Sequence, residues 1–242
     1  MLTPRRSLLP SLRRTSPGQK DWDAHVSHAE RLAGTTAFTS LRDDIIGRAA
    51  LAPGEQVLDV GAGTGLLALN AAQRGARVTA LDISARMCDR LRAIASESGV
   101  QLEAIVQASA SRLPFESAAF DVVISNYCLH ELDDGGKREA LGEIRRVLRP
   151  GGRFVFADMM FALGLATRRD RRLILGKVRA MLAKGPAGVW RLVRNAARVA
   201  TGRWEQPASA EWWRQTLHET GFTDITVETL GHEGGIASAR RP

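Results

Sequence analysis

The 242-residue chain is 44% hydrophobic and carries a net charge of +8, which is the composition of a globular protein with one large α/β domain. No apolar run is long enough to span a bilayer, and two cysteines imply no disulfide framework, so we expect a reducing cytoplasm. The charge is uneven, because residues 1–20 hold five basic residues and no acid, and residues 164–204 hold eleven and one acid. The remainder is therefore acidic, which disfavours a broad nucleic-acid-binding surface.

The first 50 residues divide into a tail and a helical segment. Residues 1–20 are predicted to form a basic flexible tail, and residues 21–242 a single domain. Apolar spacing predicts helices at about residues 25–32 and 40–50. Trp22 stands just before the first helix, where it could anchor that helix to the core.

Residues 57–65, with the sequence VLDVGAGTG, predict a buried strand that breaks into three glycines at alternate positions. Residues 66–72 then read as a helix. Glycines lack a Cβ atom and let the backbone approach a ligand, and the helix N-terminus offers unpaired N–H groups, so this is a nucleotide-type cradle. The spacing differs from the G-x-G-x-x-G of dinucleotide-binding proteins. A purely structural turn is the alternative.

A second strand is predicted at residues 77–82 and ends at Asp82. A carboxylate at this place, about twenty residues after the glycines, accepts hydrogen bonds from ribose hydroxyls. The alternative is that Asp82 caps the helix predicted at residues 85–98, which starts near Ser84. The glycines and Asp82 alone would fit a nicotinamide cofactor equally well.

The third and fourth strands are expected at residues 102–107 and 120–126. The fourth ends at Asn126, followed by Tyr127 and His130. Ligands bind at the carboxyl ends of parallel strands, so Tyr127 and His130 are candidate general bases. A packing role beside the ligand is the alternative for His130.

The second half of the chain begins with a helix at residues 137–147, followed by a Pro-Gly-Gly turn and a fifth strand within residues 148–158. Asp158, at the end of that strand, is expected to face the substrate. Residues 159–205 form an insertion of two basic amphipathic helices broken at Gly185-Pro186. The insertion is interpreted as a lid over the substrate, a membrane-surface element or a site for an anionic ligand.

The C-terminal region is predicted to contain a helix that ends at Gly221, a strand at residues 222–230, a turn at residues 231–235 and a strand at residues 236–239. His232 and Glu233 fall in the turn, which is expected only to reverse the chain.

Three motifs together resemble class I S-adenosylmethionine-dependent methyltransferases: residues 57–65, the Leu-Pro-Phe block at residues 113–115 before the Phe120-Asp121 strand start, and residues 148–158. The resemblance is to small-molecule enzymes like those of ubiquinone and menaquinone biosynthesis, and it covers about residues 21–239. It implies a doubly wound, Rossmann-like α/β fold with a seven-stranded sheet, mostly parallel with an antiparallel last strand, and helices on both faces. The prolines of DNA amino-methyltransferases are absent after Asn126.

The resemblance also implies S-adenosyl-L-methionine as cofactor. In this family the glycine loop holds the methionine end, the acid at position 59 helps to fix the ammonium group, and an aromatic residue like Trp22 covers the cofactor. Ser109 stands where the family has an adenine-binding acid, so that contact is expected to be weaker, while Ala110 still offers its backbone N–H. The residues expected to bind the cofactor are Trp22, Asp59, Gly61, Ala62, Gly63, Gly65, Asp82, Ile83, Met87, Ser109, Ala110 and Asn126.

The expected reaction is methyl transfer to an oxygen, nitrogen or carbon nucleophile of a small, lipophilic molecule, with His130 or Tyr127 accepting a proton where the acceptor requires it. No Cys/His spacing suggests a metal site. Peripheral membrane contact through residues 164–204 is a further expectation, and nucleic acid is a disfavoured partner. Two alternatives stay open: an RNA methyltransferase that uses the basic insertion, and a non-catalytic, membrane-associated cofactor-binding protein.

Overall fold

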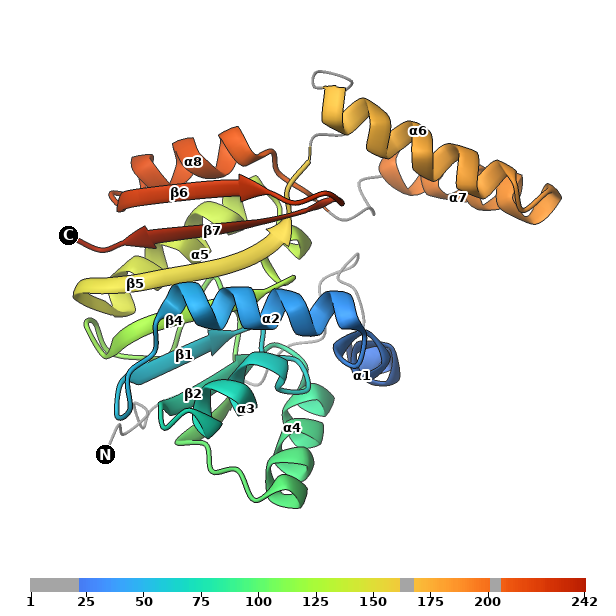
Figure 1. The fold of residues 1–242 in the computed structure, drawn as a ribbon. Helices are drawn as coiled ribbons and strands as arrows, with labels where there is room; N and C mark the ends of the chain where they lie inside the picture. The colour runs from blue at the N-terminus through green and yellow to red at the C-terminus, as the bar shows by residue number, and fades with distance from the viewer. Residues whose placement is uncertain (1–21, 162–167, 201–205) are drawn as a thin grey trace.

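The computed structural model describes residues 22–161, 168–200 and 206–242. Its centre is a seven-stranded sheet with the order β3-β2-β1-β4-β5-β7-β6 (Figure 1). Strands β1 to β5 pair in parallel, and β7 runs antiparallel to both β5 and β6. This arrangement confirms the predicted fold class. The strands are β1 (Gln56–Val60), β2 (Arg77–Asp82), β3 (Ala104–Gln107), β4 (Phe120–Asn126), β5 (Leu148–Met159), β6 (Thr223–Thr229) and β7 (Gly234–Arg240).

Helices cover both faces of the sheet (Figure 1). Successive strand residues point to opposite faces, so Val57 packs in the core with α2 and α3, and Leu58 packs in the core with α5 and α8. The helical elements are η1 (Trp22–His25), α1 (Val26–Ala33), α2 (Thr36–Ala49), α3 (Leu66–Gln73), α4 (Ala85–Ser98), η2 (Leu129–Glu131), α5 (Asp134–Val147), α6 (Arg168–Leu182), α7 (Pro186–Ala200) and α8 (Ala210–Glu219).

The last strand differs from its prediction. Gly234 and Gly235 belong to β7 and pair with Met159 and Asp158, whereas the sequence placed both glycines in a turn. A Cβ on Gly235 would lie 2.4 Å from the sulfur of Met160 and 2.8 Å from a backbone oxygen. Glycine is therefore present because β7 passes close to its neighbours, and not because the chain reverses there.

Two other boundaries also shift. Strand β3 begins at Ala104, two residues after its predicted start at residue 102. Helix α5 begins at Asp134, because the carboxylate of Asp133 accepts a hydrogen bond of 2.7 Å from the backbone N–H of Gly136 and caps the first turn.

The insertion contains the two predicted helices, α6 and α7, which pack together as a hairpin and project from the body (Figure 1). The helices approach closely at Gly188, where a Cβ would lie 1.7 Å from the carbonyl oxygen of Met181. The guanidinium of Arg169 fixes the base of the hairpin by donating to the carbonyls of Met160, Leu230 and Gly234. The lid role stays a prediction.

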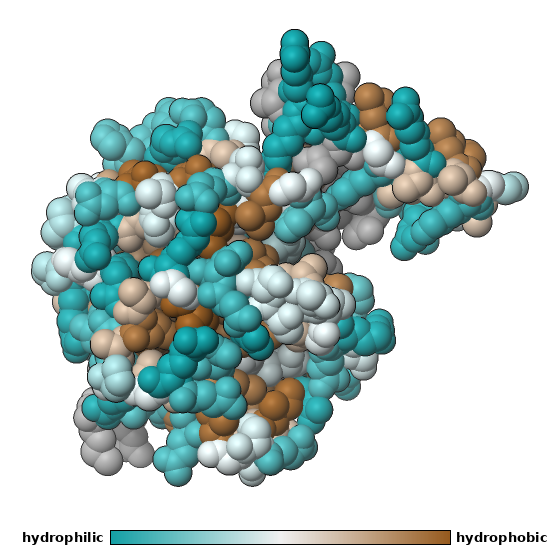
Figure 2. Space-filling model, in the orientation of Figure 1, coloured by the Kyte–Doolittle hydropathy of each residue, from teal (hydrophilic) through white to brown (hydrophobic). Residues whose placement is uncertain are grey.

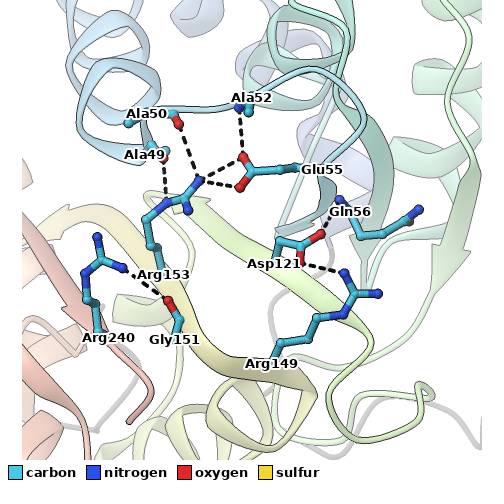
Figure 3. A network of polar contacts seen from close by, with 10 residues as sticks. All are labelled: Ala49, Ala50, Ala52, Glu55, Gln56, Asp121, Arg149, Gly151, Arg153 and Arg240. Carbon is cyan, nitrogen blue, oxygen red and sulfur yellow. Dashed lines mark hydrogen bonds and ion pairs between the residues drawn. The ribbon is translucent and has the colours of Figure 1, made fainter.

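The amino edge of the sheet, opposite the predicted ligand edge, carries a polar network (Figure 3). Arg153 donates to the carbonyls of Ala49 and Ala50 at the end of α2, and to the Glu55 carboxylate at 2.8 and 2.9 Å. These contacts supply donors to helix carbonyls that have no partner within the helix. The network therefore ties α2 to the sheet.

The basic tail at residues 1–20 lies outside the described residues, as do residues 162–167 and 201–205 of the insertion. No helix of the described residues has the length and apolar character needed to cross a bilayer.

Candidate functional site

The glycine loop joins β1 to α3 and has positive φ angles at Gly61, Gly63 and Gly65. The three glycines serve different purposes. A Cβ on Gly61 would lie 2.2 Å from the sulfur of Cys128, and one on Gly65 would lie 2.3 Å from Leu91 of α4, so both permit close packing. A Cβ on Gly63 would meet nothing within 4 Å. Gly63 therefore faces open space, as expected where the backbone approaches a ligand.

Asp82, at the end of β2, is joined to this loop. One carboxylate oxygen accepts a hydrogen bond of 2.8 Å from the backbone N–H of Gly63, and the other accepts one of 2.9 Å from Ser84. The cap of α4 is Ser84, whose hydroxyl accepts from the backbone N–H of Met87, so the alternative that Asp82 caps this helix is wrong. Burial raises the pKa of Asp82. The carboxylate keeps acceptor capacity beyond these two bonds, so ribose binding stays a prediction.

Asp59 and Asn126 present buried acceptors that have no hydrogen-bond partner in the structure. Asp59 lies in β1 and is 1% exposed, and both of its carboxylate oxygens are unpaired. The side-chain oxygen of Asn126, at the end of the neighbouring strand β4, is also unpaired. Burial raises the pKa of Asp59 to about 8. The backbone N–H of Ala68 opposes this rise without making a hydrogen bond to either carboxylate oxygen, and the nearby Asp82 carboxylate adds to the rise. A buried unpaired carboxylate is unfavourable until a cation or donor satisfies it.

The N-terminal helices dock beside this loop. Asp23 of η1 accepts hydrogen bonds from the Ser84 hydroxyl at 2.5 Å and from the backbone N–H of Arg86 at 3.1 Å. Glu30 of α1 pairs with Arg90 of α4 at 2.6 Å. Trp22 is therefore held near the start of α4, with its ring centroid 5.6 Å from that of His25. Its role as a cover for the cofactor stays a prediction.

Four other predicted cofactor residues lie around the ends of β2 and β3. Ile83 is 37% exposed directly after Asp82, whereas Met87 is 4% exposed in the first turn of α4. The Ser109 hydroxyl lies 2.9 Å from that of Ser111 and accepts a bond from the backbone N–H of Ser111, so this turn already uses part of its hydrogen-bonding capacity. Ala110 packs partly buried against the core between them.

The segment after β4 carries the two predicted proton acceptors. Tyr127 has a φ of 51°, a left-handed conformation that is uncommon outside glycine, and its N–H donates to the carbonyl of Ala157 at 2.8 Å. Its ring centroid lies 5.3 Å from that of Phe38 in α2 and 5.8 Å from that of His130. Burial raises the pKa of Tyr127, so the phenol stays protonated at neutral pH.

His130 is 6% exposed and lies between two carboxylates. Its Nδ1 is 2.5 Å from an oxygen of Asp158, whose other oxygen accepts from the backbone N–H of His130 at 3.1 Å. Its Nε2 is 3.3 Å from Glu131. Burial alone would lower the pKa of His130, but the two carboxylates outweigh it and raise the pKa to about 10. At this pKa the ring is an imidazolium at neutral pH with both nitrogens donating, a form that cannot accept a proton, and the role of His130 as a general base stays a prediction.

Asp158 occupies a different place from the one expected. It is fully buried and supports His130, and so does not face a substrate. The sequence signal was a single acid at the end of an apolar strand, which does not identify its partner. Sequence reasoning also missed Lys137, a fully buried lysine that donates to the carbonyl of Leu132 at 2.8 Å and holds the same segment.

The glycine loop borders a surface depression of about 350 Å³, lined in part by Thr64, Gly65 and Arg42. A larger depression of about 800 Å³ lies against α8 and β6, away from the carboxyl edge of β1, β2 and β4. The volume of a surface depression therefore does not identify the ligand site. The residues that fit a ligand are the ones that gather at the carboxyl edge of the sheet, where open α/β sheets bind ligands.

The residues at this edge fit an adenosyl amino-acid cofactor. The unpaired oxygens of Asp59 and Asn126 suit an ammonium donor, and the open backbone at Gly63 admits a ligand against the loop. Among the described residues, no group of three or more His, Cys, Asp or Glu side chains is placed to hold a metal ion.

Residues 57–152 match the methyltransferase domain family. A demethylmenaquinone methyltransferase of Clavibacter sepedonicus is 34% identical over 217 residues, which cover 86% of this chain and 83% of that protein. The chain belongs to the class I S-adenosylmethionine-dependent methyltransferase family. This methyltransferase domain is also 32% identical over 186 residues to the sarcosine/dimethylglycine N-methyltransferase of Halorhodospira halochloris, which cover 76% of the chain and 57% of that relative's length.

A solved structure agrees with the fold of this methyltransferase. A S-adenosylmethionine-dependent methyltransferase from Aquifex aeolicus superposes with a TM-score of 0.63, over 90% of this chain and 98% of that one, at 15% identity. At this identity the likeness shows the fold alone, and the role of each site residue rests on the geometry above.

Proposed function

We propose that this chain transfers the methyl group of S-adenosylmethionine to an oxygen, nitrogen or carbon nucleophile of a small, lipophilic molecule. The observation that carries the proposal is the pair of buried, unpaired acceptors on Asp59 and Asn126 beside the open backbone of Gly63. A ligand with an ammonium group would satisfy both acceptors and favour the ionised form of Asp59, whose pKa is raised to about 8 by burial. Nicotinamide cofactors carry no ammonium group.

The nature of the methyl acceptor is inferred from the aromatic side chains at the same edge of the sheet. The rings of Phe38 and Tyr127 meet there, with centroids 5.3 Å apart, and they provide an apolar wall for an aromatic or aliphatic molecule. Two of the named relatives carry names of small-molecule methyltransferases, one for sarcosine and dimethylglycine and one for demethylmenaquinone. These names support a small acceptor and do not identify it.

The chemistry supplied by the bound cofactor is an electrophilic methyl group on a sulfonium. The residues of this chain have to align the acceptor with that methyl group and exclude water. His130, held as an imidazolium by Asp158 and Glu131, fixes the segment that carries Tyr127. Tyr127 then positions the acceptor through its ring and its protonated hydroxyl. An acceptor with a free lone pair or an existing anion needs no base.

Calorimetric titration with S-adenosylmethionine, S-adenosylhomocysteine and NAD tests the cofactor. Binding of both adenosyl compounds and not of NAD is the expected result, and binding of NAD alone would overturn the proposal. A screen of radiolabelled methyl transfer, starting with lipophilic phenols and quinols, then tests the acceptor. Cofactor binding with no transfer to any acceptor would favour the non-catalytic alternative, and methylation of RNA would favour the RNA methyltransferase alternative.

A further inference from the structure

The α6–α7 hairpin exposes an apolar strip that the body does not cover. Among the large hydrophobic residues that the described chain leaves exposed, every one except Ile83 lies on this hairpin. Surface patches of this kind on a soluble fold mark interaction sites. The strip consists of Leu175, Leu182, Val189, Trp190 and Val193, which are 52%, 50%, 46%, 67% and 55% exposed.

Basic side chains flank this strip. Residues 168–200 contain ten basic residues and one acid, Asp170, which is 4% exposed. Two of the basic residues, Arg169 and Lys177, are used at the base of the hairpin, where Lys177 pairs with Glu233 at 3.2 Å. Other cations face solvent, and they are Arg168, Arg171, Arg172, Arg179, Lys184, Arg191 and Arg194.

The helical spacing places apolar and basic residues next to one another on the hairpin. Arg168, Arg172, Leu175, Arg179 and Leu182 follow one another at intervals of three or four residues, so they share one side of α6. On α7, Trp190 lies one turn from Arg194 and next to Arg191. Figure 2 shows hydrophobic and hydrophilic residues side by side on the projecting hairpin. Apolar and cationic side chains therefore reach the same external surface.

We propose that the α6–α7 hairpin binds the surface of an anionic lipid bilayer. A basic helix with exposed Trp and Leu lies in the plane of a bilayer, where apolar side chains enter the acyl boundary and Lys and Arg contact anionic headgroups. A second copy of this strongly basic hairpin would be repelled. RNA would find basic residues, but residues 168–200 expose only one aromatic ring, Trp190, and offer no stacking platform.

This surface goes beyond the proposed methyl transfer and does not depend on it. The hairpin begins after the carboxyl end of β5, and Arg169 ties it to the β6–β7 turn, so it projects from the ligand edge of the sheet (Figure 1). A protein docked through the hairpin would hold that edge near the membrane, where the lipophilic acceptor of the proposed methyl transfer would be dissolved.

Vesicle co-sedimentation of the full chain tests the proposal. Vesicles of phosphatidylcholine alone are compared with vesicles that contain about 30% phosphatidylglycerol, because anionic lipid supplies the surface potential that attracts basic segments. We expect binding to the anionic vesicles, weakened by salt, and a blue shift of tryptophan emission. Trp190→Phe should retain vesicle binding and lose most of the blue shift.

Two double variants separate the contribution of the basic side chains to vesicle binding from that of the apolar side chains. Arg191→Glu with Arg194→Glu should weaken vesicle binding at least about twenty-five-fold, since each lost cation contributes about fivefold. Trp190→Ser with Val193→Ser should also weaken it, and both variants should keep the far-UV circular dichroism and cofactor affinity of the wild type. The matched control is Arg31→Glu with Arg92→Glu, which makes the same charge change on exposed positions of the body and should bind nearly as well.

Each contrary outcome overturns the proposal. These are absent binding to anionic vesicles, an equal loss in the control variant, or tighter binding to RNA than to vesicles. A Trp190 emission shift produced by cofactor or acceptor without lipid would indicate a closing lid. Dimerisation that Trp190→Ser with Val193→Ser abolishes would indicate a second copy as the occupant. Calorimetric binding of S-adenosylhomocysteine is measured in parallel, so failure here is distinguishable from failure of the proposed function.

Discussion

At the scale of single residues, the site contains left-handed backbone conformations and a buried acid without a hydrogen-bond partner. Gly63 has a φ of 53° in open space, Tyr127 has a φ of 51°, and Asp59 is a buried acid without a partner. The conformation of Tyr127 and the unpaired acid of Asp59 are unfavourable in the absence of a ligand, whereas glycine adopts a positive φ without steric cost and leaves space for a ligand at position 63. These residues therefore give the sharpest tests of where the ligand binds.

Gly63→Val should abolish most binding of S-adenosylhomocysteine, because its side chain would project into the space beside the loop. The matched control is Gly99→Val at the end of α4, where φ is 66° and a Cβ likewise meets nothing within 4 Å. Both variants should lose similar thermal stability, since both force a β-branched residue into the left-handed region. Calorimetry and thermal melts measure the two effects. Equal affinity in the two variants would show that the ligand site is misplaced.

Asp59 should make the free protein less stable as pH rises. Its pKa is near 8 in the folded state and near the ordinary value of about 4 in the unfolded chain, so between these values the folded state binds more protons. The free energy of unfolding therefore falls from about pH 4 to pH 8 through this group. Asp59→Asn removes that fall, so its melting temperature relative to the wild type should rise between pH 5 and pH 8.5. Asp89→Asn, an exposed carboxylate on α4, is the control; parallel curves for Asp59→Asn and the wild type would contradict the prediction.

His130 should remain an imidazolium well above neutral pH, because its folded-state pKa is raised to about 10 by Asp158 and Glu131. Its contribution to stability is complete below the unfolded pKa of about 6.5 and is lost as pH rises through about 10. Imidazole ¹⁵N NMR, assigned with His130→Gln, measures the titration. Asp158→Asn should move the titration to lower pH. A wild-type ring that deprotonates below pH 7 would restore His130 as a candidate base.

At the scale of elements, the two edges of the sheet have different tasks. The carboxyl edge collects the ligand residues, whereas the amino edge joins α2 to the sheet through Arg153 and Glu55 (Figure 3). Ala50, which ends α2, has a φ of 46° and donates back to the carbonyls of Ile46 and Gly47. The helix that carries Phe38 is therefore fixed at the end far from the site.

Arg153→Met should lower the free energy of unfolding by about 2 kcal/mol, because Arg153 is 20% exposed and donates to two carbonyls and a carboxylate. Arg149→Met is the comparison in the same network. Arg149 is 44% exposed and pairs with Asp121, so its loss should cost less than about 1 kcal/mol. Urea denaturation measures both. Equal losses would show that the carbonyl contacts of Arg153 contribute little.

At the scale of the whole molecule, the chain consists of a packed body and a basic projection. Neither core cluster of the described residues includes a side chain from α6 or α7. The hairpin is instead held by Arg169 and Lys177 at its base and by its own contact at Gly188. Folding of the body should therefore depend little on the hairpin.

Replacement of residues 168–200 with a short Gly-Ser linker tests this separation. The variant should fold cooperatively, bind S-adenosylhomocysteine within about twofold of the wild type and lose vesicle binding, since stability and cofactor contacts lie in the body. Thermal melting, calorimetry and co-sedimentation measure the three properties. Loss of cofactor affinity in a folded variant would show that the hairpin contributes to the cofactor site.

Much of the fold of this protein could be predicted from its sequence, because local patterns of residues determine the secondary structure. Alternating strands and helices, with the glycine loop at residues 57–65 and the turn within residues 148–158, fix a parallel α/β sheet and its ligand edge. The basic amphipathic pattern of residues 168–200 likewise predicted two helices, which form as α6 and α7. Helical and strand periodicity are properties of neighbouring residues, so sequence alone reveals them.

The tertiary structure decided what depends on contacts between distant residues. Asp158 meets His130 only because β4 and β5 are neighbours in the sheet, and that contact favours the protonated form of the candidate base. Gly235 is a glycine because Met160 passes close to it, not because the chain turns. The apolar strip of the hairpin is exposed because no part of the described body packs over it, which an amphipathic pattern cannot reveal. Such pairings are set by the packing of whole elements, and local sequence does not encode them.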